Sequence, residues 1–290
     1  MLDKIKMLHI EPTTRCNAWC SGCSRNKGGF GLADGLNLED LSIERLKAIL
    51  DSATQLQWVI FCGTNGDPCA SKIIDQQLNL IYSKKIYLQL HTNGSLRNEE
   101  WWRELAVKFK DKIEVWFGID GLEDTHGYYR QGTNWKKIIN NAKSFIGGGG
   151  KAVWQFIPFA HNEHQIKDCI RLSQKLGFKE FRFIKDARYR KTFHYKTGEE
   201  LDIKPWSGHN QTWKRRRNGL LNTVQNPTYK KTKVELNDCV HLCYPSLFLN
   251  AHGTITPCCM HPKKDIKNFN IQKDFDDKKW LPNCLKNCGS

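Results

Sequence analysis

The sequence has no long apolar run. No segment of its 290 residues approaches the roughly 20 consecutive apolar residues that a membrane-spanning helix needs. The N-terminal segment Met1–Lys6 holds no apolar core of the kind found in a secretory signal peptide. These two absences predict a cytoplasmic protein that has no membrane partner.

Cysteine, by contrast, is plentiful, with 12 residues. Cytoplasmic thiols are kept reduced, which argues against a disulfide framework and favours metal ligation. Three cysteines lie within residues 16–23 and six within residues 239–288, while Cys62, Cys69 and Cys169 fall between. This distribution predicts two metal sites, one near each end of the sequence.

The N-terminal group, Cys16, Cys20 and Cys23, has the spacing CxxxCxxC and no fourth cysteine nearby. Structural zinc sites and electron-transfer clusters normally have four protein ligands. A four-iron cluster held by three cysteines keeps one iron open for a substrate or a cofactor. We therefore predict metal binding here rather than a chance group of buried thiols.

The fold is predicted from an alternation of short apolar runs and amphipathic stretches up to about residue 185. Such alternation is typical of βα units with a parallel sheet, and six units favour a partial (βα)6 TIM-like barrel in the α/β class. The expected strands are Ile5–Glu11, Gln57–Cys62, Ile86–His91, Ile113–Ile119, Ala152–Pro158 and Glu180–Ile184. The expected helices are Glu39–Ala53, Ile73–Ser83, Asn98–Phe109, Trp135–Phe145 and Glu163–Leu176.

Three domains follow from this pattern: a barrel over residues 1–185, a basic linker and insertion over 186–238, and a small cysteine-rich domain over 239–290. The last is too short to be stable without a metal or packing against the barrel. Phe248 and Ile255, around Gly253, predict two short strands joined by a turn within it.

The formal net charge of +15 is consistent with an acidic partner such as nucleic acid or an anionic peptide. The run Lys214–Arg217, with Trp206 and Trp213 nearby, could contact phosphates and bases. A solvated basic insertion is the alternative interpretation.

Glycine-bearing turns follow several of the expected strands, at Gly63–Pro68, Thr92–Gly94 and Gly118–Gly121. Because the carboxyl ends of parallel strands form the active-site edge, we expect these turns to surround the cysteine loop.

With these motifs, the chain resembles the radical S-adenosylmethionine (SAM) enzymes. The resemblance covers roughly the first 185 residues, and the cysteine motif is its most specific part. The residues that carry it are Cys16, Cys20 and Cys23, the Asn65–Pro68 turn, which is similar to the family's Gly-Gly-Glu-Pro segment, the Thr92–Gly94 turn, and Asp120–Leu122 followed by Tyr129 and Arg130.

The resemblance implies a [4Fe-4S] cluster whose open iron binds SAM, and reductive cleavage of SAM to a 5′-deoxyadenosyl radical. It implies that the methionine amino group is contacted by Asn65, Gly66 and Asp67. Asp120 would lie near the ribose, and Arg130 would either balance the SAM carboxylate or form a loop salt bridge.

Gln155 would approach the cofactor or the substrate. An external electron donor such as flavodoxin or ferredoxin is also implied. One departure is Gly22, where the family often has an aromatic residue near the adenine. Trp19 or Phe30 could substitute, or either could be a core aromatic.

The C-terminal cysteines resemble those of SPASM and twitch domains, which hold auxiliary iron–sulfur clusters. Cys243 and Cys258 bracket Gly253 with the family's spacing. Cys284 and Cys288 are expected to complete one auxiliary cluster of the [4Fe-4S] type in the twitch arrangement, with Cys239 as an alternative ligand. Zinc would suit four thiolates equally well.

We therefore expect a radical SAM enzyme that abstracts hydrogen from a peptide or a small molecule. The alternatives are modification of RNA or DNA by the same chemistry, and a zinc-stabilised nucleic-acid-binding protein. The sequence assigns no general base. The candidates by residue type are Asp120, His126, His161 and His164.

Overall fold

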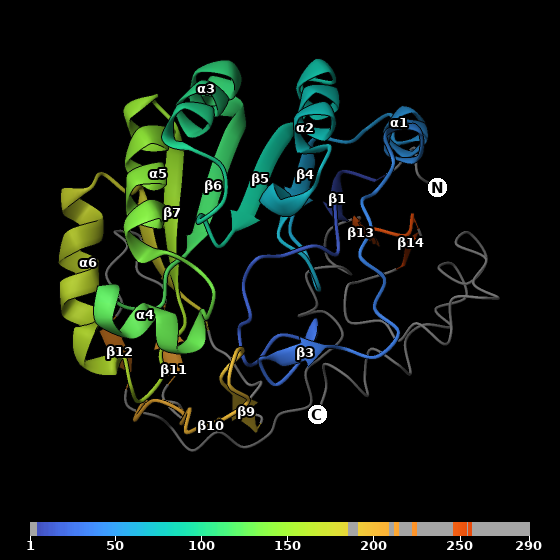
Figure 1. Cartoon of the computed structure of the whole chain (residues 1–290). Coiled ribbons are helices and arrows are strands. Elements are labelled where there is room, and N and C mark those ends of the chain that lie inside the picture. The colour runs from blue at the N-terminus through green and yellow to red at the C-terminus, as the bar shows by residue number, and fades with distance from the viewer. Residues whose placement is uncertain are drawn as a thin grey trace.

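The protein is an α/β structure, seen in a computed structural model. Its central sheet has the strand order β14-β13-β1-β4-β5-β6-β7-β8. Seven of these strands run parallel, and β14 pairs antiparallel with β13. Helices α2, α3, α5 and α6 lie along the outer side of this sheet (Figure 1). The structure describes residues 5–184, 191–208, 212–214, 222–224, 246–253 and 255–256.

The sheet strands are β1 (Met7–Ile10), β4 (Trp58–Phe61), β5 (Tyr87–Thr92), β6 (Ile113–Gly118), β7 (Lys151–Phe156), β8 (Glu180–Phe183), β13 (Ser246–Leu249) and β14 (Ile255–Thr256). The α-helices are α1 (Ile43–Ser52), α2 (Ile74–Ser83), α3 (Glu99–Phe109), α4 (Glu123–Tyr129), α5 (Trp135–Gly147) and α6 (Ile166–Lys175). Short 3₁₀ helices are η2 (Pro68–Ala70), η3 (Lys110–Lys112) and η4 (Glu163–Gln165). Three antiparallel pairs are β2 (Asn26–Lys27) with β3 (Phe30–Leu32), β9 (Thr192–Phe193) with β10 (Glu200–Leu201), and β11 (Thr212–Lys214) with β12 (Asn222–Val224).

The six predicted strands and the five predicted helices are confirmed. Each strand end lies within two residues of its predicted position. The first helix begins four residues later than predicted, because Ser42 is its N-cap and accepts a hydrogen bond from Arg45 N–H (3.2 Å). Helix α4 was not among the predicted helices.

The two faces of the sheet differ in chemistry, as β6 illustrates. Ile113 and Phe117 belong to the apolar core under the helices, where the Phe117 ring lies 5.2 Å from that of Trp102. Glu114 and Trp116 alternate with them and face the barrel interior, with a hydrogen bond between them (2.6 Å). At β6 the interior side of the sheet is therefore polar and aromatic, whereas the side under the helices is apolar.

The predicted C-terminal hairpin is confirmed, and its first strand extends the barrel sheet by pairing with β1. Glu11 N–H donates to Leu249 O (2.8 Å), and Arg45 Nε donates to Gly253 O (3.0 Å). Most of residues 239–290 lie outside the described residues, so the three domain boundaries stay a prediction. In the described part of the chain, no helix has the length and apolarity needed to cross a membrane.

Candidate functional site

The cysteine loop, residues 11–25, follows β1 directly. Cys16, Cys20 and Cys23 form no disulfide among the described residues and are partly exposed. Cys23 N–H donates to the Cys20 carbonyl (3.0 Å), so a turn brings these two cysteines together. The chain continues into β3, which lies beyond the carboxyl ends of the sheet strands (Figure 1). Parallel α/β folds place their active sites at this end.

N–H groups point at two of the cysteine sulfurs. Ala18 N–H lies 3.3 Å from Cys16 Sγ, and Arg25 N–H lies 3.5 Å from Cys23 Sγ. Hydrogen bonds of this kind favour the thiolate, and they tune the potential of an iron–sulfur cluster. The loop therefore offers both the ligands and the polar surroundings that a cluster needs.

The donor set fits a cluster better than a single ion. Within the residues that the structure describes, no group of three His, Cys, Asp or Glu side chains could hold one metal ion. The cysteines of a [4Fe-4S] cluster bind different irons and need not converge so closely. Desolvation raises the pKa of the Cys16 thiol, and the nearby Asp67 and Cys20 raise it further. Coordination to iron would reverse this, because a coordinating thiol loses its proton.

The turn after β5 touches the cysteine loop, as predicted. Asn93 is buried, and its Nδ2 donates to Asn17 Oδ1 (2.9 Å) and lies 3.8 Å from Cys16 Sγ. Its Oδ1 accepts a hydrogen bond from Ser95 N–H (2.9 Å). Asn93 therefore fixes the position of the first cysteine relative to the sheet.

The turn after β4, residues 63–67, packs on the same loop. A Cβ on Gly66 would lie 1.9 Å from Thr13 O, so only glycine fits at this position. Ser24 Oγ donates to Asn65 Oδ1 (3.1 Å). The predicted SAM-binding turn therefore borders the cysteine loop, and its contacts with SAM stay a prediction.

Asp67 joins the turns after β4 and β5. Its carboxylate accepts hydrogen bonds from Asn93 N–H (2.7 Å), Cys69 N–H (2.9 Å) and Thr92 Oγ1 (2.9 Å). Burial raises the pKa of Asp67, although these hydrogen bonds oppose the rise. These three donors fix the carboxylate between the two turns, and a contact of Asp67 with the SAM amino group stays a prediction.

Glu11 is a site residue that the sequence analysis missed. It is buried at the end of β1, and its Oε1 accepts a hydrogen bond from Asn65 N–H (2.6 Å). Burial raises the pKa of Glu11, while hydrogen bonds from the 64–66 amides and from Ala251 N–H oppose the rise. One carboxylate thus holds both the predicted SAM-binding turn and the β13–β14 turn. In the sequence, the signal that could have indicated this role is a single charged residue at the end of an apolar strand.

Glu11→Gln should weaken SAM binding without unfolding the protein. Glutamine keeps the shape but replaces a charged acceptor with a neutral amide, and hydrogen bonds to charged groups contribute about 1.5–3 kcal/mol. We expect the SAM dissociation constant of the reconstituted protein to rise about tenfold in isothermal titration. Glu44→Gln, at an exposed position of α1, should leave it unchanged. Equal affinities for Glu11→Gln and the unaltered protein would contradict this role.

Asp120 and Arg130 form a buried ion pair. Arg130 Nε lies 2.6 Å from Asp120 Oδ2, and Ile157 N–H donates to Asp120 Oδ1 (2.7 Å). A Cβ on Gly118 would lie 2.7 Å from the Arg130 guanidinium, so the glycine makes room for it. Of the two roles considered for Arg130, the structure shows the loop salt bridge. Contacts of either residue with SAM stay predictions.

His126 holds α4 against the end of β6. Its Nδ1 accepts from Asp120 N–H (3.0 Å), which leaves Nε2 to donate to Thr133 Oγ1 (3.0 Å). Thr133 in turn donates to Arg130 O (2.6 Å). Burial lowers the pKa of His126 to about 3, with Arg130 contributing. Because both ring nitrogens are bonded, the structure offers His126 no free lone pair for a general base.

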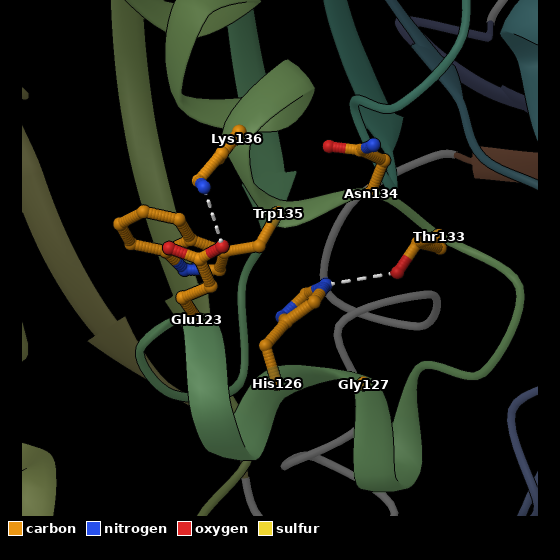
Figure 2. Close-up of a pocket in the computed structure, with 7 residues that line it drawn as sticks. All are labelled: Glu123, His126, Gly127, Thr133, Asn134, Trp135 and Lys136. Atoms are coloured by element: carbon orange, nitrogen blue, oxygen red, sulfur yellow. Dashed lines mark hydrogen bonds and ion pairs between the residues drawn. The ribbon is translucent and has the colours of Figure 1, made fainter.

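Figure 2 shows His126 and Thr133 facing each other in a surface depression of about 380 Å³ between α4 and the start of α5. Lys136 reaches Glu123 there, in an exposed ion pair (3.0 Å). The depression includes none of the predicted cysteine ligands or SAM contacts. Its lining residues are Glu123, His126, Gly127, Thr133, Asn134, Trp135 and Lys136.

His126 should make the protein sensitive to acid. The unfolded chain binds a proton near pH 6.5 that folded His126 does not, so stability is full above that pH and falls towards pH 3. His126→Gln should reduce the slope of unfolding free energy between pH 6 and 4.5 by up to about 1.4 kcal/mol per pH unit. Urea unfolding at several pH values measures it. His164→Gln, at an exposed position, should keep the slope, and an unchanged slope in His126→Gln would refute the assignment.

His161 and His164, two further candidates for a general base, lie near each other after β7. His161 is partly buried and stacks on Phe159, with ring centroids 5.4 Å apart. Burial lowers the pKa of His161 to about 4, with His164 contributing. Asp120 is already paired with Arg130, so the structure selects no general base.

Gln155 lies at the end of β7, in register with Gly118 of β6 and Arg182 of β8, and is partly exposed. Its predicted contact with cofactor or substrate stays a prediction. Asn162 is buried and donates to the Asp120 carbonyl (3.1 Å), so it supports the loop after β6.

The segment after the barrel also reaches the cysteine loop. Gln131 is buried, and its backbone carbonyl accepts a hydrogen bond from Trp19 N–H (2.8 Å). Its side-chain Nε2 donates to Phe193 O (2.9 Å). Its Oε1 accepts from Tyr195 N–H (2.9 Å). Within the predicted linker 186–238, the described hairpin β9–β10 is therefore bonded to the site, which the polar sequence did not indicate.

Trp19 and Phe30 are the two candidates for the missing aromatic residue. The Trp19 ring lies 6.4 Å from that of Tyr195, while Phe30 is 49% exposed. Adenine stacking by either stays a prediction. The predicted auxiliary ligands lie outside the described residues, and these are Cys239, Cys243, Cys258, Cys284 and Cys288.

The chain is similar to several solved structures. SuiB from Streptococcus suis bound to S-adenosylmethionine matches with a TM-score of 0.63 and 16% identity, over 94% of this chain and 66% of that one. A second SuiB structure matches with a TM-score of 0.59 and 17% identity, over 89% of this chain and 61% of that one. The protein anSMEcpe with bound AdoMet matches with a TM-score of 0.50 and 22% identity, over 61% of this chain and 50% of that one. The chain spans less than two thirds of each of these proteins, and at these identities the likeness shows the fold.

Sequence comparison identifies the family. No curated protein matches the chain. The family model "Radical SAM superfamily" matches residues 10–179, which is more than half of the sequence and includes the cysteine loop and the turns that border it. The chain belongs to the radical SAM superfamily.

Proposed function

We propose that this chain reductively cleaves SAM to a 5′-deoxyadenosyl radical and abstracts hydrogen from a peptide substrate. The observation that carries the proposal is the three-cysteine loop bordered by the turns after β4 and β5. A [4Fe-4S] cluster held by Cys16, Cys20 and Cys23 would supply the electron and the open iron that binds SAM.

The protein's own residues would bind and orient the cofactor. The backbone of the Asn65–Gly66 turn would bind the methionine amino group, with Glu11 and Asp67 holding the turn in place. The polar barrel interior, where the Arg182 guanidinium lies 4.1 Å from the Trp116 ring centroid, would hold the substrate. The β9–β10 hairpin, bonded through Gln131, would limit the access of water.

A peptide substrate is supported by two similar structures. One is SuiB bound to the precursor peptide SuiA, with a TM-score of 0.58 and 15% identity. The other is anSMEcpe with AdoMet and the Cp18Cys peptide, with a TM-score of 0.50 and 20% identity. The proposal includes one auxiliary cluster within residues 239–290 and an external donor such as ferredoxin or flavodoxin. The nucleic-acid alternative rests on a basic run of which residues 215–217 lie outside the described residues.

Deuterium transfer tests the substrate class. Reconstituted, dithionite-reduced protein would be incubated with SAM and deuterated peptides encoded beside the gene, with deuterated RNA in a parallel reaction. Mass spectrometry should find deuterium in 5′-deoxyadenosine only in the peptide reaction. Transfer from RNA alone would overturn the peptide assignment while leaving the radical chemistry intact.

A further inference from the structure

Arg25 is a buried cation next to the cysteine loop. It is 4% exposed and follows Cys23 by two residues. Its Nε donates to Thr14 O (3.3 Å), and its guanidinium carbon lies 5.1 Å from the Trp19 ring centroid. Its Nη1 is buried and has no hydrogen-bond partner. Contacts with the protein therefore hold this side chain in place, but among the described residues no acidic side chain neutralises its charge.

Other arginines near the site have acidic partners. Arg15 pairs with Asp40 (3.3 Å), and Arg130 pairs with Asp120 (2.6 Å). Among the described residues, no carboxylate forms an ion pair with Arg25. An arginine side chain stays protonated, and an uncompensated buried charge is strongly unfavourable. The geometry therefore calls for an anion beside Arg25.

We propose that this anion is the cysteine-bound cluster and that Arg25 raises its reduction potential. The inference rests on the proposed function, because it requires the cluster. A [4Fe-4S] cluster with three thiolates has a net negative charge, which grows by one unit on reduction. The Arg25 backbone already contacts Cys23 Sγ (3.5 Å), and net charge and hydrogen bonding set cluster potentials.

The redox step involves one electron and no bond change. An external one-electron donor is oxidised as the cluster is reduced, and Arg25 keeps its proton throughout. The positive charge favours the reduced, more negative form. Arg25 is thus a positioning and tuning residue that acts through the cluster.

Arg25→Gln should lower the midpoint potential of the cluster by about 59 mV, which is a tenfold loss in its equilibrium constant for reduction. An EPR-monitored titration of the reconstituted protein without SAM measures this, and Cys16→Ala identifies the signal. Arg25→Lys keeps the charge and should shift the potential by less than half as much. Arg15→Gln makes the same charge change in the same loop, but at a partly exposed ion pair. Its smaller shift should disappear in high salt, whereas that of Arg25→Gln should persist.

A second measurement does not require the cluster. In the metal-free protein, Arg25→Met removes an unbalanced charge and keeps much of the packing, so its melting temperature should equal or exceed that of the unaltered protein. A clear drop in melting temperature would assign Arg25 a structural role and overturn the inference. An unchanged potential in cluster-loaded Arg25→Gln would also overturn it. Neither readout involves a substrate, so failure of the proposed peptide chemistry would be seen separately.

Discussion

Cys16→Ala should reduce SAM cleavage to background and lower the iron content of the reconstituted protein. The cysteine loop offers three thiols, and its neighbours Asn93 and Ala18 direct N–H groups at Cys16 Sγ (3.8 and 3.3 Å). With one ligand missing, two cysteines cannot hold a stable four-iron cluster. The measurements are iron analysis, the visible absorption spectrum, and 5′-deoxyadenosine formation with dithionite and SAM.

The matched control for this experiment is Cys169→Ala. Cys169 is a fully buried free thiol on α6, so this change also removes one sulfur. It should retain the iron content and the SAM cleavage of the unaltered protein. If Cys16→Ala kept full cleavage, or if Cys169→Ala lost it equally, the N-terminal loop would not be the cluster site.

Asp120→Ala should lower the free energy of unfolding by about 3–5 kcal/mol, because it leaves the Arg130 charge buried without its partner. Asp120 is fully buried, and its loss also frees the Ile157 N–H. Urea unfolding at neutral pH measures the change. The double variant Asp120→Ala/Arg130→Met should recover part of the loss, because it removes the unpaired charge.

Asp168→Ala is the control for the buried pair. It breaks the exposed Asp168–Arg171 pair on α6, and such surface pairs contribute about 0–1 kcal/mol. A loss in Asp120→Ala no larger than that in Asp168→Ala would show that the Asp120–Arg130 pair does not stabilise the barrel end.

The barrel was predictable because its six predicted strands are short segments rich in β-branched or aromatic residues and lie between amphipathic helices. In β6, for example, all six residues are buried. Helix α4 was not predictable in the same way. Its seven residues are held by the His126 contacts with Asp120 and Thr133, which periodicity does not reveal.

Local motifs in the sequence indicated where the candidate site lies, but the contacts that hold it together join residues far apart in the sequence. The cysteine spacing and the Asn65–Asp67 turn were visible in the sequence. The partners of Glu11 are 54 and 240 positions away, at Asn65 and Ala251, and no local pattern indicates such contacts. The pairing of β13 with β1 is equally distant in the sequence. A loop salt bridge was one of the two roles considered for Arg130, but its partner, Asp120, was not predicted.

Quantifying 5′-deoxyadenosine from the unaltered protein tests the central claim most directly. The chain would be purified and reconstituted with iron and sulfide under anaerobic conditions, reduced with dithionite, and incubated with SAM. We predict a brown protein that forms 5′-deoxyadenosine and methionine in equal amounts, and only when reduced. A colourless, zinc-containing protein that forms no 5′-deoxyadenosine would contradict the account.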